Sequence, residues 1–579
     1  MGEFEDDVHR KAGPGRRWMP LGFVSFCVLV VGGVADFFGR MDLGDIFPSD
    51  TVSYLDCMRA FERGDLHAAL NPLWSPGYPA LLALLRPAFP AAPEGTWYAA
   101  HTLNFLIYAA SWIAFVWLAR ELSPDGRFQS WLVILAGSAF VTAEACLDQV
   151  PRIGPDKLVA LLFYVACALQ ARLLRKDERE GGALLGVALG LGFLAKAPML
   201  IVGVVMLGLT AFLLARRGER VRSVMVAGGL FLAIVFGYGA ALSRATGWAT
   251  LGESGSLNYA WHVNRLQKWV HWQGGTSDAG EAWGSRRLAG FARWTEDPPT
   301  FGAPVHPTRA EGQEPTVYLF SADRHATYDP YFDPPYWYRG YAHVFRWRYQ
   351  LIALARNAFH LVMLGRMPFV WGLGIFAFWG WKMGERGRMR RRDATAVALS
   401  AGLAILVYLP VHLEERYIAA PLAVLALVLV VRFTPPTPGR FFAAWLVCGV
   451  ALLGVEMNQA VVWTDMVHGV TFRDNAKWKL GAALRRSGVA PGTQIAVVSF
   501  GPSYDCDWAY LAGVEIVGEV ASERDEAALV KLAPEAREGV LGRFSEEGAK
   551  VVVTRDAVVG ELPGWRRVGD VPMWIYELR

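Results

Sequence analysis

Between Lys196 and Arg217 the chain reads KAPMLIVGVVMLGLTAFLLARR, and residues 197–215 carry no charge. An α-helix rises about 1.5 Å per residue and the hydrocarbon core of a bilayer is about 30 Å thick, so about 20 apolar residues cross it. This stretch therefore predicts a membrane-spanning helix over 198–215, with charged residues only beyond its two ends.

Apolar stretches of this kind recur through about residue 463 and predict a polytopic α-helical membrane protein. About eleven spans are expected, at 19–38, 100–119, 128–146, 157–174, 183–196, 198–215, 223–243, 366–382, 394–410, 417–432 and 441–463. The first is interpreted as an uncleaved anchor, because it is long and no small-residue cleavage site follows it. Residues 346–365 carry three arginines and a histidine and predict an amphipathic helix at the interface.

Composition excludes several classes of protein. Of the 579 residues, 53% are hydrophobic and 19% are charged, with a mean hydropathy of +0.26. So much apolar surface excludes a disordered or collagen-like chain. A net charge of +4 is too small to indicate a nucleic-acid partner. No CxxC or HExxH pattern occurs, so no metal site is predicted.

Lysine and arginine gather in alternate loops, and these residues resist translocation across a membrane. We therefore expect the N-terminus in the cytoplasm and three segments outside: a first loop at 39–99, a long loop at 244–345, and a tail at 464–579. With the interfacial helix, the long loop extends to 365. The expected organisation is a transmembrane domain at 1–463 followed by a small soluble α/β domain.

The tail alternates strand-like and helix-like patterns. Strands are expected at 494–500, 514–520 and 550–554 and near 573–576, with helices at 475–487 and 535–547.

Residues 190–195 read GLGFLA and fit a dinucleotide-binding pattern, yet they follow no strand and lie within a membrane span. With Gly182 and Gly186, Gly190 instead forms a row of small residues at four-residue spacing. Such a row predicts close contact between helices in a membrane.

Cys27, Cys167 and Cys448 fall in the interior of predicted spans and are expected to pack as small apolar residues. The other three, Cys57, Cys146 and Cys506, are expected on the outer side, where a disulfide can form. Since three thiols leave one over, the sequence does not choose a pair.

The first outer loop carries the most informative functional pattern. Residues 48–55 read PSDTVSYL and residues 71–82 read NPLWSPGYPALL. An Asp just beyond a first membrane anchor, four residues before a Tyr and followed by a Pro-rich return with an aromatic, resembles the GT-C superfamily of integral-membrane glycosyltransferases. Lipid A aminoarabinose transferases and protein O-mannosyltransferases are its nearest named relatives. The resemblance implies that Asp50 is the catalytic base, with Tyr54 beside it, and the same Asp also suits the N-cap of a helix at 51–63.

Three further segments resemble the same superfamily, and the resemblance covers roughly residues 15–435. Asp156, in the stretch GPDKL, stands where relatives carry an Asp at the outer end of a helix. The stretch GFLAKAP at 192–198 looks like their Gly-Phe-x-x-Lys-Gly turn, with Ala197 in place of the second glycine. The stretch EERYIAAP at 414–421 looks like their Arg-Tyr-x-x-x-Pro motif.

The resemblance implies a donor sugar on polyprenyl phosphate, whose tail lies in the bilayer and whose phosphate lies at the outer interface. Because negative charge develops on the leaving phosphate, cations are needed there. Lys196 and Arg416 suit this task, with Arg152 as a weaker third candidate. Two alternatives stay open: Lys196 extends toward lipid headgroups, or Arg416 pairs with a neighbouring glutamate. Further site candidates are Asp156, Tyr417 and Glu415. No cofactor or metal is expected beyond this lipid-linked donor.

The long outer loop is rich in aromatic residues: 12 of the 35 residues at 315–349 are Phe, Tyr or Trp, against 13% in the whole chain. Aromatic faces stack on sugar rings and carboxylates bond sugar hydroxyls. Candidates for acceptor binding are therefore Asp329, Asp333, Tyr336 and Trp337. Prolines and aromatics equally pack into a rigid cap, and we prefer this interpretation for most of the segment.

The expected function is inverting transfer of a sugar from polyprenyl phosphate to an acceptor outside a bacterial inner membrane. Asp50 would take the proton of an acceptor hydroxyl or amine as that group attacks the anomeric carbon. The alternatives are transfer of a preassembled oligosaccharide, a transporter, and a receptor or scaffold. Oligosaccharyltransferases carry a paired acid in the first loop, whereas Asp50 has no adjacent acid. A transporter predicts inverted repeats, and none stands out.

Overall fold

The structure is a computed structural model that describes residues 14–41, 49–123, 130–148, 150–176, 179–219, 221–266, 271–274, 301–312, 314–320, 325–364, 392–433, 472–498 and 506–578. The chain forms two compact units. The helical unit comprises Met1–Arg40, Trp97–Tyr238 and Leu351–Thr464. The mixed unit comprises Met41–Thr96, Gly239–Gln350 and Asp465–Arg579.

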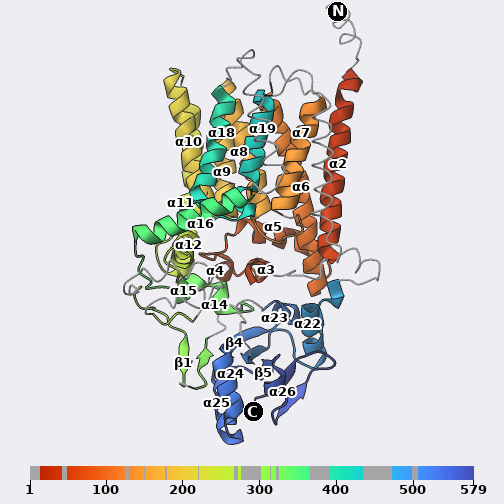
Figure 1. The fold of residues 1–579 in the computed structure, drawn as a ribbon, viewed down its shortest axis with the longest axis vertical. Coiled ribbons are helices and arrows are strands. Elements are labelled where there is room, and N and C mark those ends of the chain that lie inside the picture. Colours follow the sequence, from red (N-terminus) through yellow and green to blue (C-terminus); the bar gives the residue numbers. More distant parts are fainter. Residues whose placement is uncertain are drawn as a thin grey trace, which may run out of the picture. The chain divides into compact units, whose positions relative to one another are not determined.

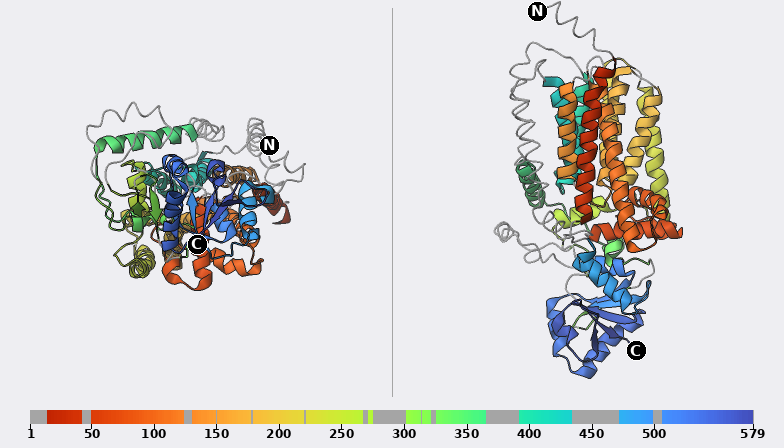
Figure 2. Two further views of the ribbon diagram at one scale, coloured as in Figure 1. Left: turned by 90° about the horizontal axis from the view of Figure 1, so that it is seen from below. Right: turned by 90° about the vertical axis from the view of Figure 1, so that its right-hand side faces the viewer.

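Long helices lie side by side in the helical unit (Figures 1 and 2). Those described are α2 (Pro14–Met41), α6 (Pro93–Leu122), α7 (Ser130–Val141), α8 (Asp156–Lys176), α9 (Arg179–Ala195), α10 (Met199–Arg216), α11 (Arg222–Thr246), α18 (Arg392–Tyr408) and α19 (Glu415–Phe433). Among the described residues, four helices are long and apolar enough to cross a membrane, namely α6, α8, α10 and α11. The shorter apolar helices are Leu21–Phe37, Gly181–Ala195 and Asp393–Tyr408.

Most of the predicted spans fall on these helices. The spans expected at 366–382 and 441–463 lie outside the described residues. The span expected at 128–146 is α7 followed by a π-helix, Thr142–Leu147. The structure therefore supports a helical membrane protein, without fixing the number of spans at eleven.

The row of glycines on α9 packs against α11, as its spacing predicted. A Cβ on Gly182 would lie 2.3 Å from the carbonyl oxygen of Ser223, and a Cβ on Gly186 would lie 2.3 Å from that of Ala227. A Cβ on Gly190 would lie 2.5 Å from the Ile234 side chain. Since no real Cβ comes that close to a backbone oxygen, only glycine permits the approach of these two helices.

The segment expected to be amphipathic forms α16 (Trp347–Leu364). Figure 1 shows this helix lying crosswise to the helices of the bundle. Leu351, Phe359 and Val362 are exposed, whereas Asn357 is buried and its Nδ2 donates a 2.9 Å hydrogen bond to the backbone oxygen of Leu409. One face is therefore apolar and exposed, and the other is attached to the segment after α18.

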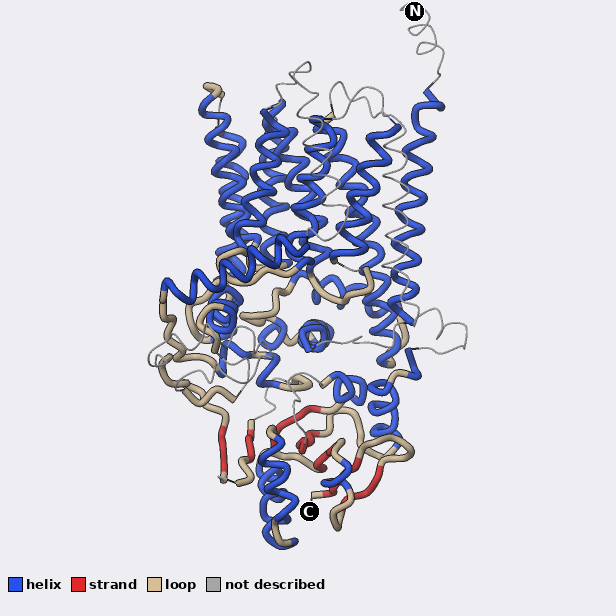
Figure 3. Tube along the Cα trace, viewed as in Figure 1, coloured by secondary structure: helices blue, strands red, loops and turns tan. Residues whose placement is uncertain are grey.

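The mixed unit contains one seven-stranded sheet, ordered β1-β2-β4-β3-β5-β7-β6 and shown red in Figure 3. Its strands are β1 (Arg309–Glu311), β2 (Val317–Leu319), β3 (Gln494–Val498), β4 (Glu515–Val520), β5 (Val551–Thr554), β6 (Trp565–Arg567) and β7 (Trp574–Glu577). The central strand β3 is parallel to β4 and β5, and the remaining pairs are antiparallel. The apolar side chains of these strands pack with those of the tail helices into one core.

Two strands of this sheet come from the long loop, not from the tail. Strand β2 pairs with β4, where Tyr318 lies opposite Glu519 and Leu319 lies opposite Gly518. The predicted strands of the tail are present as β3, β4, β5 and β7. The expected division at residue 463 nevertheless needs amending, because the long loop and the first loop belong to the same compact unit as the tail.

Short helices complete the mixed unit. Those of the two loops are α3 (Ser49–Arg63), α4 (Leu66–Ala69), α5 (Gly77–Leu85), α12 (Ser254–His262), α14 (Asp329–Phe332) and α15 (Pro334–Trp337). Those of the tail are α22 (Ala476–Arg486), α23 (Asp507–Ala512), α24 (Glu523–Lys531), α25 (Pro534–Glu546) and α26 (Ala557–Gly560). Cys57 and Cys506 are buried free thiols, and the side chain of Cys146 lies outside the described part.

Candidate functional site

Asp50 lies in the first turn of α3. Its side chain is half-buried, and Oδ1 accepts a 2.6 Å hydrogen bond from the hydroxyl of Tyr331. Tyr331 belongs to α14, 281 residues further along the chain. A carboxylate bonded by a phenol keeps one orientation, and a general base must be oriented toward the proton that it takes.

An aromatic cluster supports this pair. The ring of Tyr54, one helical turn after Asp50, packs edge-on against Trp74 and Tyr78, with ring centroids 5.2 and 6.4 Å away. The ring of Trp74 also lies 5.9 Å from that of Tyr331. Tyr54 therefore packs within a cluster that connects α3 and the Pro-rich return to α14.

Hydrogen bonds attach the aromatic segment 325–338 to the first loop. Asp56 accepts two of them from Thr327, at 2.9 Å from the backbone nitrogen and 3.0 Å from the hydroxyl. Asn71 Nδ2 and Trp74 Nε1 both donate to the backbone oxygen of Phe332, at 2.7 and 2.8 Å. Because these bonds lie on both sides of Tyr331 in the chain, they place its hydroxyl against Asp50.

The carboxyl group of Asp56 is fully buried at this attachment. Burial raises its pKa to about 6, although the charge of Arg59 and the two hydrogen bonds from Thr327 act in the opposite direction. Arg59 Nη1 lies 3.7 Å from Asp56 Oδ1. The charge of Asp56 therefore changes within an accessible pH range.

The residues predicted to bind the acceptor lie mostly in the interior. Asp333 is 0% exposed, and Asp329 and Trp337 are each 8% exposed. Tyr336 is half-buried, and its ring stacks on His306 with centroids 4.0 Å apart. This burial agrees better with the rigid-cap interpretation than with a surface open to an acceptor.

Three residues predicted for the donor side come together in the helical unit. Asp156 is the first residue of α8, Lys196 follows the last residue of α9, and Arg416 lies in the first turn of α19. Lys196 Nζ lies 2.5 Å from Asp156 Oδ1, and Arg416 Nη1 lies 3.5 Å from Asp156 Oδ2. One carboxylate thus holds two cations, one at each of its oxygens.

Tyr417 and Glu414 complete this cluster. Lys196 Nζ lies 3.9 Å from the centroid of the Tyr417 ring, a cation–π distance. Glu414 accepts a 2.6 Å hydrogen bond from Arg416 Nε and lies 2.9 Å from His412 Nε2. Burial acts to raise the pKa of Glu414, but the His412 hydrogen bond and the charge of Arg416 outweigh it and lower that pKa. Glu414 is therefore ionised near neutral pH.

Lys196 occupies a tight turn between α9 and α10. Its backbone nitrogen donates to the oxygen of Gly192 at 2.9 Å, and its backbone oxygen accepts from Met199 at 3.1 Å. Pro198 precedes α10, where its fixed φ suits the start of a helix. A Cβ on Gly192 would lie 2.8 Å from Met199 Cε, so glycine leaves room for the turn.

The contacts of Lys196 and Arg416 bear on both alternatives that the sequence left open. Arg416 pairs with Glu414, as the salt-bridge alternative expected, and it also faces Asp156. The side chain of Lys196 is 17% exposed and is bonded to Asp156. Glu415 lies 3.0 Å from His360.

Sequence reasoning missed a second buried pair beside this cluster. Lys157 Nζ lies 3.6 Å from Asp148 Oδ2, and each side chain is 2% exposed. Lys157 Nζ also donates a 3.0 Å hydrogen bond to the backbone oxygen of Arg152, so Arg152 contributes its carbonyl oxygen to this pair. An acid at the end of an apolar stretch was the available signal for Asp148. No sequence signal distinguished Tyr331 from the other aromatic residues of the long loop.

The donor-side cluster is electrically balanced. Lys196 and Arg416 supply two positive charges, and Asp156 and Glu414 supply two negative ones. The carboxylates hold the cations in fixed orientations, and both cations are hydrogen-bond donors of the kind that phosphate oxygens accept. Among the described residues, no group of three or more His, Cys, Asp or Glu side chains is placed to hold a metal ion.

No family model matches the sequence, and no curated protein matches it either. Solved structures do resemble it. ArnT from Cupriavidus metallidurans in the apo state is 13% identical with a TM-score of 0.51, covering 96% of this chain and 97% of ArnT. The same protein bound to undecaprenyl phosphate gives the same values. The oligosaccharyltransferase AglB from Archaeoglobus fulgidus is 11% identical with a TM-score of 0.47, covering 92% of this chain and 69% of AglB. The likeness to ArnT shows that this chain shares the fold of that protein over almost its whole length, and the sequence motifs above had predicted a fold of the GT-C kind.

Proposed function

We propose that this protein is an inverting glycosyltransferase that moves a sugar from a polyprenyl-phosphate donor to an extracytoplasmic lipid, glycan or protein. The observation that carries the proposal is the convergence of Lys196 and Arg416 on Asp156 at the ends of three helices of a GT-C fold. ArnT, which shares this fold, has been solved with undecaprenyl phosphate bound, and that supports a donor of the same class.

On the donor side, Lys196 and Arg416 bind the phosphate and stabilise the charge that grows on it as the sugar leaves. Asp156 and Glu414 hold the two cations at fixed positions, so that little reorganisation is needed when the bond breaks. Tyr417 holds the ammonium group of the lysine by its cation–π contact.

On the acceptor side, Asp50 is the general base. It takes the proton of the acceptor hydroxyl or amine while the acceptor oxygen or nitrogen forms a bond to the anomeric carbon. The bond between that carbon and the phosphate oxygen breaks in the same step, and its electron pair stays on the lipid phosphate. Attack from the face opposite the phosphate inverts the configuration of the sugar.

The same proposal places the protein in a bacterial inner membrane, with its N-terminus in the cytoplasm and the mixed unit outside. The distribution of Lys and Arg supports this orientation. Cysteines introduced at exposed Leu66 and exposed Arg486 should then react with a membrane-impermeant maleimide in intact spheroplasts. Labelling only after lysis would overturn the orientation.

The proposed activity is tested with the purified full-length protein and a panel of polyprenyl-phosphate sugars. The readout is release of polyprenyl phosphate in the presence of an envelope extract as acceptor source. We expect release from at least one donor, and abolition by Asp50→Asn.

Asp65→Asn is the matched control. Asp65 caps α4 through a hydrogen bond from the backbone nitrogen of Ala68, and Asn caps a helix equally well. This variant should keep full activity. Release from no donor, or full activity in Asp50→Asn, would sink the proposed function.

A further inference from the structure

A pocket of about 230 Å³ lies within the mixed unit, between the first loop and the tail. Its lining from α3 begins at Met58, eight residues and so about 12 Å along the helix from Asp50. The other walls come from residues 86–96, from α22 and from the region of Pro491 and Leu511. No role proposed above for the donor or the acceptor uses this pocket.

Three arginines line this pocket against one acidic residue, Glu62. The first, Arg485, lies in the last turn of α22. Its Nη1 is buried and has no hydrogen-bond partner among the described residues. An unpaired guanidinium nitrogen is costly to bury, because the N–H group loses water and gains nothing in return. The guanidinium of Arg485 therefore keeps donor capacity that the described residues do not use.

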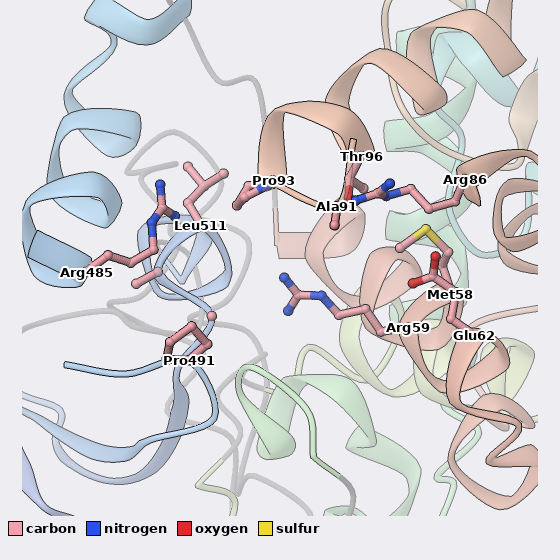
Figure 4. A pocket seen from close by; sticks show the side chains of 12 residues that line it. Met58, Arg59, Glu62, Arg86, Ala91, Pro93, Thr96, Arg485, Pro491 and Leu511 are labelled. Atoms are coloured by element: carbon pink, nitrogen blue, oxygen red, sulfur yellow. The ribbon is translucent and has the colours of Figure 1, made fainter. Parts of the chain in front are cut away.

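The second arginine, Arg59, is held flat on an aromatic ring. Its guanidinium carbon lies 3.6 Å from the centroid of the Tyr510 ring, and Nη2 donates a 3.2 Å hydrogen bond to the Tyr510 backbone oxygen. Figure 4 shows the side chain extending from α3 toward the wall formed by Pro491 and Leu511. Stacking fixes the plane of the guanidinium, which is how arginine is prepared to bind planar or tetrahedral anions.

The third arginine, Arg86, is anchored by its own loop. Nε donates to the Thr96 hydroxyl at 2.9 Å, and Nη1 and Nη2 donate to the backbone oxygens of Phe89 and Ala92 at 3.0 and 3.3 Å. These bonds use much of its donor capacity, so Arg86 contributes mainly charge. The residue is 7% exposed, and its charge is therefore poorly screened by water.

The wall opposite α3 is closely packed and partly apolar. Gly481 lets α22 approach α23 closely, since a Cβ there would lie 2.8 Å from Leu511 Cβ. Leu511, Pro491 and Met58 supply apolar surface beside the three guanidinium groups. The pocket thus pairs a site for one anionic group with apolar surface for a small attached group.

We propose that this pocket binds a phosphate monoester, with Arg485 and Arg59 bonding the phosphate oxygens and Arg86 adding charge. Guanidinium groups suit phosphate because two parallel N–H groups match two of its oxygens. The phosphate comes either from a soluble metabolite or from the headgroup of an anionic lipid, and both present the same chemistry to the pocket.

The test measures binding to the full-length protein by isothermal titration calorimetry in two arms. The soluble arm uses glycerol 3-phosphate with the protein in detergent. The lipid arm uses the protein in phosphatidylcholine nanodiscs with and without phosphatidic acid, and native mass spectrometry detects retained phosphatidic acid. We expect binding in at least one arm, and Arg485→Gln should weaken it at least tenfold.

Arg486→Gln is the matched control, because Arg486 is the next residue on α22, is exposed and does not line the pocket. It should bind as the native protein does. Arg59→Lys keeps the positive charge but loses the two parallel N–H groups of the guanidinium and its stacking on Tyr510. Its affinity for the phosphate should therefore be intermediate. Both α22 variants should keep the native melting temperature. No binding in either arm, or equal losses in Arg485→Gln and Arg486→Gln, would overturn the proposal.

The variant Lys196→Met distinguishes phosphate binding in this pocket from phosphate binding at the donor-side cluster. It should abolish sugar transfer while leaving the Arg485-dependent binding unchanged. Loss of that binding in Lys196→Met would show that the measured phosphate sits at the donor side, and the pocket proposal would then fall while the transferase proposal stood.

Discussion

The hydroxyl of Tyr331 donates a 2.6 Å hydrogen bond to Oδ1 of Asp50, and so joins the long loop to the first turn of α3. The bond depends on the whole attachment of segment 325–338 to the first loop. Its consequence is that the proposed base is oriented by a residue far away in sequence.

Tyr331→Phe should lower kcat for sugar transfer about tenfold with little change in KM for the donor. The phenyl ring still fills the aromatic cluster, but the carboxylate loses the partner that orients it, and misplacing a base costs rate. Steady-state kinetics with varied donor would measure the effect. A melting temperature equal to that of the native protein is the control for folding, and an unchanged kcat would show that Tyr331 only packs.

Lys196→Met should lose transfer activity and also destabilise the protein by about 3 kcal/mol, because Asp156 keeps its charge with one partner fewer. The double variant Lys196→Met/Asp156→Asn should regain much of the stability and none of the activity. Thermal melting in detergent, combined with the donor assay, gives a double-mutant cycle. Additive losses of stability would mean that the 2.5 Å pair contributes no coupling.

Asp56 should make the protein less stable as the pH rises from about 4 to about 6. Burial raises its pKa in the folded state from 3.8 to about 6, so the folded state holds the proton more tightly than the unfolded chain does. The raised pKa of Asp56 stabilises the folded state by about 3 kcal/mol at low pH. This stabilisation is fully present below pH 4 and is lost as the pH rises through 6.

Asp56→Asn should remove that pH dependence, because Asn still accepts from the Thr327 backbone nitrogen and does not titrate. The measurement is the difference in melting temperature between native protein and variant from pH 4 to pH 8. The melting temperature of the variant should rise relative to that of the native protein as the pH rises. A difference in melting temperature that stays constant from pH 4 to pH 8 would contradict the prediction.

Gly186→Ala should separate α9 from α11 and lower the free energy of unfolding by about 1–3 kcal/mol, as overpacking does elsewhere. A Cβ there meets the carbonyl oxygen of Ala227 at 2.3 Å, and a backbone atom has little freedom to move. Gly181→Ala, five residues earlier on the same helix, is the control, since a Cβ there meets nothing within 4 Å. Equal melting temperatures in the two variants would show that the helices tolerate the extra methyl group.

Local pattern and spacing predicted much of the helical unit. A helix in a membrane must bond its own backbone and cover its length with apolar side chains, and both requirements are visible in sequence. The row of glycines on α9 is also visible in the sequence, because residues four apart lie on one face of a helix. The motifs around Lys196 and Arg416 pointed to one site, and their cations do share Asp156.

Pairing between distant segments was not predictable in this way. Nothing at Tyr331 indicates that it meets Asp50, since one hydroxyl among 12 aromatic residues is indistinguishable from its neighbours. The three-residue strands β1 and β2 are likewise too short to show a period of two. Burial of Asp333 at 0% exposure depends on tertiary packing, which the sequence of the loop does not express.

The pairing of β2 with β4 has a consequence for biosynthesis. Tyr318 and Glu519 face each other across 519 − 318 = 201 residues, and α18 and α19 lie between them in the chain. In the orientation proposed above, a nascent chain must insert those helices and export the tail before the sheet can close. Until then β2 presents an unpaired edge, and contacts this distant in sequence form slowly. Assembly of the mixed unit thus belongs to the last stage of synthesis, and a ribosome that stalls before β4 would release a product prone to aggregation and proteolysis.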